Sequence, residues 1–250
     1  MTFSWRNDER QEMTSKSPRA KQQKSSKGLF ITFEGTEGSG KTTQCRQLAR
    51  SLRDQGYQVL ETREPGGTPL AETLRKLLLA SSKAQGHTES ITPACETMLI
   101  FAARSQHIEH VIQPALAKGM IVLCDRFFDS TLAYQGYARS LDKTFLNNTQ
   151  QFITHGLQPH LTFFLDLPVQ DGLARRQHTK KLNRLDKESL GFHQRVRRGF
   201  LALTKEHPKR IQTVDARQAP HALTSQITSI TENVIHRKTS LRLVQSSPEA

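Results

Sequence analysis

The sequence predicts an α/β fold in which a mostly parallel sheet of five strands lies between two layers of helices. Short apolar runs rich in β-branched and aromatic residues alternate with segments whose apolar residues recur at helical spacing. Such alternation is typical of β-α-β units, whose right-handed crossovers make the strands parallel and cover both faces of the sheet. A chain of 250 residues is long enough for one domain of this kind.

The elements follow from local patterns along the chain. Helical spacing predicts helices at 41–54 and 70–79, the first ending before Gly56. The segment 94–118 is predicted to be mostly helical, with a kink or a restart at Pro114. Between the helices, the predicted strands are the apolar runs 29–34, 59–62, 120–124, 161–167 and 211–214.

The two ends of the chain differ from its middle. Residues 1–27 are polar, with seven Lys and Arg against three acids, and predict a disordered basic extension. Residues 236–250 predict a polar tail, which leaves 28–235 as the folded domain. The net charge of +13 is compatible with nucleic-acid binding, because cations neutralise backbone phosphates, but mononucleotides carry phosphate too.

The cysteines and the apolar runs together indicate in which cellular compartment the protein lies. Three cysteines without metal-type spacing suit a reducing cytosol better than a disulfide scaffold. No apolar run approaches the roughly 18 residues of a membrane helix, and the N-terminus lacks the apolar stretch of a signal peptide. We therefore expect a cytoplasmic protein without a membrane partner.

A phosphate-binding motif follows the first predicted strand. The stretch FEGTEGSGKTTQ at 33–44 contains Gly-x4-Gly-Lys-Thr between a strand and a helix, the context that a P-loop requires. Backbone N–H groups at 35–42 would form an anion nest at the positive end of the helix. Lys41 would reach the β- and γ-phosphates of a nucleoside triphosphate, and Thr42 would bind Mg²⁺. The candidate nucleotide-binding residues are Gly35, Thr36, Glu37, Gly38, Ser39, Gly40, Lys41 and Thr42.

The P-loop motif alone leaves the phosphate acceptor open. A GTPase would also carry Asn-Lys-x-Asp, which the sequence lacks. Leu123-Cys124-Asp125 could serve as the Walker B strand of a motor or helicase, but the adjacent Arg126 favours an acceptor other than water. Glu37 also needs an explanation, because it places a negative charge inside an anion-binding loop.

Four more segments lie at predicted strand ends or on adjacent helices, where open α/β sheets bind ligands. The four segments are TREPGGT (62–68), FAARSQ (101–106), DRFFDSTLAYQG (125–136) and NRLDKES (183–189). With FEGTEGSGKTT, these segments resemble bacterial thymidylate kinases, a family of P-loop nucleoside monophosphate kinases, in the same order and at similar separations over about 28–235. The resemblance implies transfer of the γ-phosphoryl group of ATP to dTMP, giving dTDP and ADP, with Mg²⁺ as cofactor.

The resemblance also assigns candidate acceptor residues. Asp125 would join Thr42 at the Mg²⁺ shell, and Arg126 would clamp the acceptor phosphate as a catalytic cation beside Lys41. The family stacks the base on a Phe at the position of Ile100, so either Phe101 replaces it or the base lies against an aliphatic wall. The candidate dTMP-binding residues are Arg63, Glu64, Phe101, Arg104, Arg126, Ser130, Thr131, Tyr134 and Gln135.

A basic stretch resembles the mobile lid of the family, at about 176–188. Members without a P-loop arginine supply one from the lid, and this P-loop has none. Arg184 is the first choice as the catalytic lid cation, with Arg175 and Arg176 as alternatives. Because Asn183 stands where the family usually has Asp, the sequence does not indicate what holds Arg184. The resemblance places Glu37, the fourth catalytic candidate, near the 3′-OH of the acceptor sugar and away from the γ-phosphate.

Two other functions remain open on sequence grounds. One is a kinase for a different nucleoside monophosphate, and the other is a P-loop ATPase that binds nucleic acid through the basic stretch 172–200. The partners that we expect are ATP and dTMP, with no nucleic acid. The resemblance further implies a homodimer.

Overall fold

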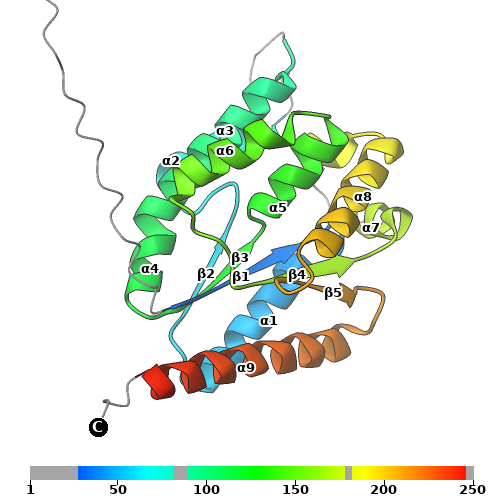
Figure 1. The fold of residues 1–250 in the computed structure, drawn as a ribbon. Helices are drawn as coiled ribbons and strands as arrows, with labels where there is room; N and C mark the ends of the chain where they lie inside the picture. The colour runs from blue at the N-terminus through cyan, green and yellow to red at the C-terminus, as the bar shows by residue number, and fades with distance from the viewer. Residues whose placement is uncertain (1–27, 81–88, 178–181, 246–250) are drawn as a thin grey trace, which may run out of the picture.

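The computed structural model of the chain describes residues 28–80, 89–177 and 182–245. The expected basic extension at 1–27, residues 178–181 of the expected lid and the last five residues of the expected tail lie outside this part. Five parallel strands form one sheet in the order β2-β3-β1-β4-β5, and helices lie on both faces (Figure 1). The predicted α/β fold class is therefore confirmed. The strands are β1 (Leu29–Glu34), β2 (Val59–Arg63), β3 (Ile121–Asp125), β4 (Leu161–Asp166) and β5 (Ile211–Asp215).

The helices form where the sequence supplies helical spacing and N-terminal caps. Thr68 caps α2, because its side-chain oxygen accepts from the N–H of Ala71 at 3.1 Å, and Pro69 occupies the first helical position. In the described part of the chain, the helices are α1 (Lys41–Asp54), α2 (Pro69–Leu79), α3 (Pro93–His107), α4 (Gln113–Ala117), α5 (Phe128–Thr131), α6 (Lys143–Thr154), α7 (Val169–Gln177), α8 (Leu190–Glu206) and α9 (Pro220–Gln245). Shorter or wider turns are η2 (Ile108–Ile112), η3 (Leu132–Ala138) and η4 (Leu185–Lys187).

Two helical segments refine the predictions. The expected helix at 94–118 restarts, because a wider π-helical turn, η2, separates α3 from α4, and Pro114 lies in the first turn of α4. At the C-terminus, α9 continues to Gln245, ten residues beyond the expected boundary at 235. Residues 236–247 contain no Pro or Gly, so nothing in the sequence interrupts the helix.

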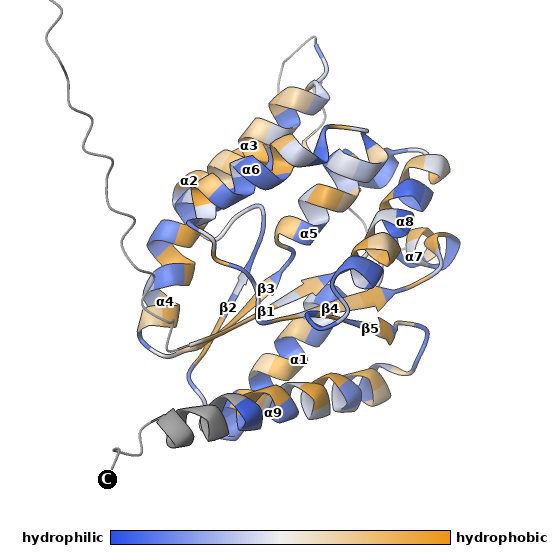
Figure 2. Cartoon of the chain, in the orientation of Figure 1, coloured by the Kyte–Doolittle hydropathy of each residue, from blue (hydrophilic) through white to orange (hydrophobic). Residues whose placement is uncertain are grey.

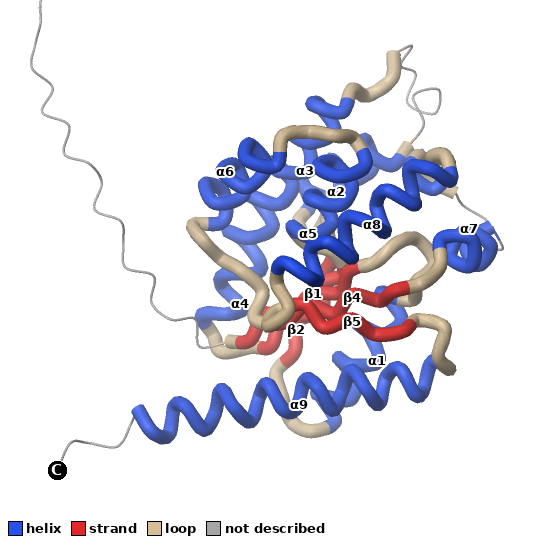
Figure 3. The backbone as a smooth tube through the Cα atoms, turned by 45° about the vertical axis from the view of Figure 1, so that its right-hand side comes forward, coloured by secondary structure: helices blue, strands red, loops and turns tan. Residues whose placement is uncertain are grey.

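Successive side chains of a strand point to opposite faces of the sheet, so the hydrophobic core has two parts, one on each face. Leu29, Ile31 and Phe33 of β1 pack with α1 and α9, whereas Phe30 faces η2 and α4. Figure 3 shows α1 and α9 on one side of the sheet and the other labelled helices on the opposite side or at its edge. In Figure 2, hydrophobic residues concentrate in the strands, and α9 alternates hydrophobic and hydrophilic residues along its length. In the described ranges, no helix is long and apolar enough to cross a membrane.

The sheet places its carboxyl-terminal edge toward the candidate site. The P-loop, defined here as residues 35–42, joins β1 to α1, and Asp125 ends the adjacent strand β3. The P-loop also touches α7 backbone to backbone: a Cβ on Gly38 would lie 2.1 Å from the carbonyl oxygen of Gly172. The first turn of α7 and the outer bend of the P-loop are therefore in direct contact.

Candidate active site

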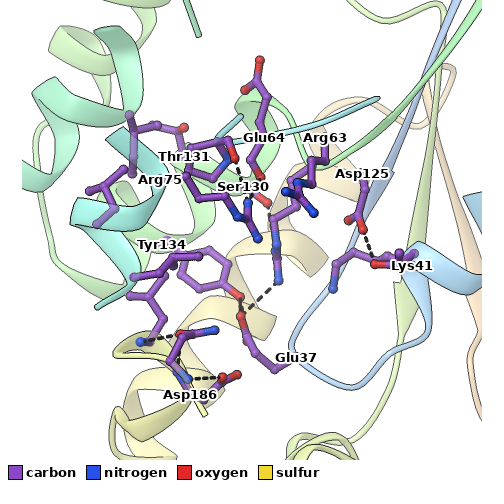
Figure 4. Close-up of a pocket in the computed structure, with 18 of the residues that line it drawn as sticks. Glu37, Lys41, Arg63, Glu64, Arg75, Asp125, Ser130, Thr131, Tyr134 and Asp186 are labelled. Carbon is purple, nitrogen blue, oxygen red and sulfur yellow. Dashed lines mark hydrogen bonds and ion pairs between the residues drawn. The ribbon is translucent and has the colours of Figure 1, made fainter. Parts of the chain in front are cut away.

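A cavity of about 560 Å³ lies at the carboxyl ends of the strands. It is lined by the P-loop, the ends of β2 and β3, helices α2, α3 and α5, the turn η3 and the segment 183–186. Figure 4 shows the labelled side chains converging on it, with Glu37 beside Tyr134. The segments that the sequence singled out, far apart along the chain, therefore meet in one place.

The side chain of the P-loop lysine, Lys41, folds back and binds the backbone of the P-loop itself. The amino group of Lys41 donates to the carbonyl oxygen of Thr36 at 2.7 Å and to Ser39 Oγ at 3.3 Å. Burial, reinforced by the nearby Arg126 guanidinium, lowers the pKa of Lys41 to about 8. The P-loop residues that line the cavity are Glu37, Gly38, Gly40, Lys41 and Thr42, whereas Gly35, Thr36 and Ser39 are not among its described lining residues.

Two oxygen ligands for a hard cation lie side by side. The Thr42 hydroxyl donates to the carboxylate of Asp125, and both residues line the cavity. Within the described ranges, no group of three or more His, Cys, Asp or Glu side chains could hold a metal by itself. This pair fits Mg²⁺, which typically binds one or two protein oxygens together with substrate phosphates and water.

Arg126 has a backbone conformation that is uncommon for a residue with a side chain. Its φ is 72°, in the left-handed region. Its N–H donates to the carbonyl oxygen of Phe33 at 2.9 Å, which ties it to β1. The guanidinium donates to the carbonyl oxygen of Gly35 at 2.9 Å, to Ser130 Oγ at 3.0 Å and to Glu37 Oε1 at 3.0 Å. Arg126 thus connects the P-loop to the segment after β3.

Glu37 faces the acceptor side of the cavity. Its two carboxylate oxygens accept from the hydroxyl of Tyr134, at 2.6 and 2.7 Å, and one of them also accepts from Arg126. Burial alone would raise its pKa. Arg126 above all, together with Lys41 and Tyr134, instead holds the pKa of Glu37 well below its usual range. The acid in the P-loop is therefore a charged partner of the acceptor-side residues.

Arg104 is a buried strut that also lines the cavity. Its Nε donates to Glu64 Oε2 at 2.6 Å, and its Nη2 donates to Thr131 Oγ1 at 2.9 Å and to the carbonyl oxygen of Phe127 at 3.2 Å. Its Nη1 donates to Gln150 Oε1 at 3.1 Å. Within the described residues, one N–H on Nη1 is left for a ligand.

The structure corrects the expectation for Phe101. Ile100 lines the cavity, whereas Phe101 is buried in the hydrophobic cluster that contains Phe164 and Phe200. Successive residues of a helix point about 100° apart, so a Phe one position along α3 cannot occupy the same wall. The aliphatic wall formed by Ile100 is the alternative that this geometry favours.

The segment 182–189 packs against α2 and α3. The N–H of Arg184 donates to the carbonyl oxygen of Leu79 at 3.0 Å, and its Nε donates to that of Leu78 at 3.0 Å. Its Nη2 binds the carboxylate of Glu96. Asn183 Oδ1 accepts from the N–H groups of Leu185 and Asp186 and so fixes this turn locally. Glu96 and the end of α2, which sequence reasoning missed, therefore hold Arg184.

The remaining predicted residues also meet at the cavity. Ser130, Thr131, Tyr134, Gln135, Arg63 and Glu64 all line it. Arg175 lines it as well, and Arg176 does so while paired with Asp186 through two contacts of 2.9 Å. Arg75 was missed: it lines the cavity from α2 and donates to the carbonyl oxygen of Pro65 at 2.7 Å. The signal that could have found Arg75 is its place on the helix directly after TREPGGT.

Comparisons with known proteins agree with this geometry. The thymidylate kinase family model matches residues 33–227. The chain belongs to the thymidylate kinase family. The thymidylate kinase of Thermomicrobium roseum is 48% identical over 209 residues, covering 83% of this chain and 96% of that protein. The thymidylate kinase of Pseudomonas syringae pv. tomato is 50% identical over 192 residues, 77% of this chain and 89% of that protein.

A solved structure gives the same result. The crystal structure of thymidylate kinase from Ehrlichia chaffeensis matches with a TM-score of 0.64 and 31% sequence identity, over 82% of this chain and 98% of that one. The family resemblance that the motifs indicated is therefore confirmed. The thymidylate kinase match contains the P-loop, the strand ends and the segment 182–189 that line the cavity.

Behind Arg126 lies a buried acid that the sequence analysis did not single out. Glu34, the last residue of β1, accepts from the N–H of Phe127 at 2.7 Å and from Ser130 Oγ at 2.5 Å. These bonds fix the residue after Arg126 and the hydroxyl that Arg126 contacts. Burial above all, and the neighbouring Asp129 carboxylate, raise the pKa of Glu34 from 4.5 to about 8.

This raised pKa predicts a pH-dependent stability. Between pH 4.5 and about 8 the folded state binds a proton at Glu34 that the unfolded state does not, so stability falls as pH rises through this window. Glu34→Gln removes this contribution. In urea unfolding at pH 5 and pH 8, the wild type should lose roughly 1–4 kcal/mol more unfolding free energy than the variant.

The partly exposed Glu232 of α9 supplies the control, because Glu232→Gln removes one carboxyl far from this network. Parallel stability curves for the wild type and Glu34→Gln would contradict the prediction.

Proposed function

We propose that the protein transfers the γ-phosphoryl group of ATP to dTMP, giving ADP and dTDP for dTTP synthesis. The observation that carries this proposal is that a P-loop and a set of acceptor-side cations line one cavity in a thymidylate kinase family chain. Two anionic substrates must approach each other in such a reaction. Catalysis therefore depends on positioning and on cations that bracket both phosphate groups.

The donor side would bind ATP through the P-loop. Lys41 would leave the carbonyl oxygen of Thr36 and donate to the β- and γ-phosphates, while N–H groups of residues 35–42 surround the phosphate chain. Thr42 and Asp125 would hold Mg²⁺ together with the nucleotide. When bound, Mg²⁺ neutralises charge that develops on the phosphate oxygens.

The acceptor side would bind dTMP beside Arg126. The guanidinium of Arg126, with Ser130 next to it and Arg63 and Arg75 at the edge of the cavity, would hold the 5′-phosphate. Glu37 would accept a hydrogen bond from the sugar 3′-OH. Tyr134, which is fixed by Glu37, would fill the space that a ribose 2′-OH needs.

The thymine base would lie between polar and aliphatic walls. The free N–H of Arg104 would donate to the ring, with Glu64 holding that guanidinium in place. Thr131 and Gln135 line the same part of the cavity, and Ile100 forms the apolar wall. The 5-methyl group of thymine adds about 1–3 kcal/mol of discrimination, so dUMP should be a poor substrate.

The free thiols support a cytoplasmic location. Cys45, Cys95 and Cys124 are all unpaired, which suits a reducing compartment.

An acceptor panel tests the function. ADP release, measured with dTMP, dUMP, dCMP, dAMP and thymidine at equal concentrations, should be fastest with dTMP by at least tenfold. Activity should require Mg²⁺ and disappear in EDTA, because Mg²⁺ neutralises charge that develops on the phosphate oxygens. Faster turnover of any other acceptor would overturn the assignment of dTMP.

Arg184 is the proposed lid cation, and it must leave Glu96 to reach the transferring phosphate. Arg184→Ala should lower kcat at least tenfold while the Kd for dTMP changes less than threefold, because the cation acts mainly in the transition state. Steady-state kinetics and titration calorimetry measure the two quantities. Arg53→Ala removes a surface arginine of α1 and is the control. Unchanged turnover in Arg184→Ala would assign Arg184 to structure alone.

Exposed apolar side chains support a homodimer. On α6, Phe152 is 78% exposed and Phe145 is 42% exposed, and Met98 of the adjacent α3 is 47% exposed. Phe152→Glu should therefore shift the full chain toward a monomer in analytical ultracentrifugation, because a charge buried in an apolar interface loses its hydration. Tyr57→Glu, between α1 and β2, is the matched control. A wild-type monomer at micromolar concentration would refute the dimer.

A further inference from the structure

A buried histidine lies against the P-loop acid without a hydrogen bond of its own. His193, in the first turn of α8, is 1% exposed. Neither of its ring nitrogens has a hydrogen-bond partner among the residues that the structure describes. Its Nδ1 lies 3.5 Å from Glu37 Oε2, just beyond hydrogen-bonding distance. A buried polar group without a partner destabilises the folded state, so its presence calls for an explanation.

The charge of Glu37 is presently balanced by two cations that the reaction would engage. Arg126 donates to Glu37 directly, and Lys41 acts on it through space. Both cations line the cavity. According to the proposed function, Arg126 binds the acceptor phosphate and Lys41 binds the donor phosphates. Glu37 would then share both cations with more highly charged groups.

Two other described residues that touch Glu37 offer no replacement for these cations, and the remaining nearby cation, Arg176, is already paired with Asp186. Tyr134 already donates its single hydroxyl hydrogen to this carboxylate. Gly172 meets Glu37 through its backbone alone and supplies no side chain. His193 therefore stands out as an unused ring donor beside the second carboxylate oxygen.

We propose that His193 is a positioning residue that donates from Nδ1 to Glu37 when substrates engage Arg126 and Lys41. This role rests on the proposed function for the identity of the substrates. Formation of the bond requires an approach of about 0.5 Å, from 3.5 Å to an ordinary N–H···O distance. Helix α8 begins at Leu190, so His193 lies in its first turn, and a small shift of that turn would bring the ring within reach.

Three substitutions of His193 separate this role from a packing role. His193→Phe removes both nitrogens and keeps an aromatic ring. Asn carries an amide nitrogen close to the position of Nδ1, whereas Gln carries it close to that of Nε2. A packing role predicts a lower Tm for His193→Phe. The positioning role predicts an equal or higher Tm, because the unpaired polar atoms are gone.

Kinetics give the decisive readout. We expect His193→Phe to raise KM for dTMP about tenfold, with KM for ATP within twofold of the wild type. His193→Asn should restore KM for dTMP to within threefold, and His193→Gln should not. In a Glu37→Gln background, where no carboxylate charge needs a partner, adding His193→Phe should cause no further change.

The outcomes that overturn the proposal are distinct from failure of the proposed function. Wild-type KM for dTMP in His193→Phe, equal rescue by Asn and Gln, or additive effects with Glu37→Gln would each overturn the role of His193 alone. A wild-type chain without dTMP kinase activity would overturn the proposed function, and the role of His193 with it.

Discussion

The contact between Arg126 and Glu37 connects the two halves of the candidate site. Arg126 follows β3 and Glu37 lies in the loop after β1, so their 3.0 Å contact bridges the ends of neighbouring strands. The contact depends on a left-handed backbone at Arg126, which is costly for a residue with a side chain. The bonds from Phe127 and Ser130 to Glu34 help to hold this conformation, so one buried acid supports the base of the site.

Charge balance explains why so many polar groups survive burial around the cavity. Among the described residues that line it, eight Lys and Arg face five Asp and Glu. Each buried acid in this lining is bound to at least one of these cations: Glu64 to Arg104, Glu96 to Arg184 and Asp186 to Arg176. The excess positive charge suits phosphate-bearing substrates. A substrate phosphate that binds one of these cations weakens or replaces the ion pair that the cation makes with its acid.

The sequence predicted the local elements well, because glycine, proline and apolar spacing act over a few residues. The strands and the P-loop context required no knowledge of distant contacts. Contacts between distant segments were harder to predict from the sequence. Glu96 and Arg184 are 88 residues apart, and no local pattern indicates that they pair. Phe101 was misplaced because a one-residue shift on a helix changes the face that a side chain occupies. His193 was missed because burial of a single histidine leaves no pattern in a sequence.

The backbone contact between Gly38 and Gly172 limits how parts of this chain can be exchanged. A side chain at either position would overlap the main chain of the other segment, since a Cβ on Gly172 would lie 2.3 Å from the carbonyl oxygen of Glu37. The outer bend of the P-loop and the base of α7 are thus a matched pair, although more than 130 residues separate them. A chimera that imports a P-loop with a bulkier bend must import its own α7 as well.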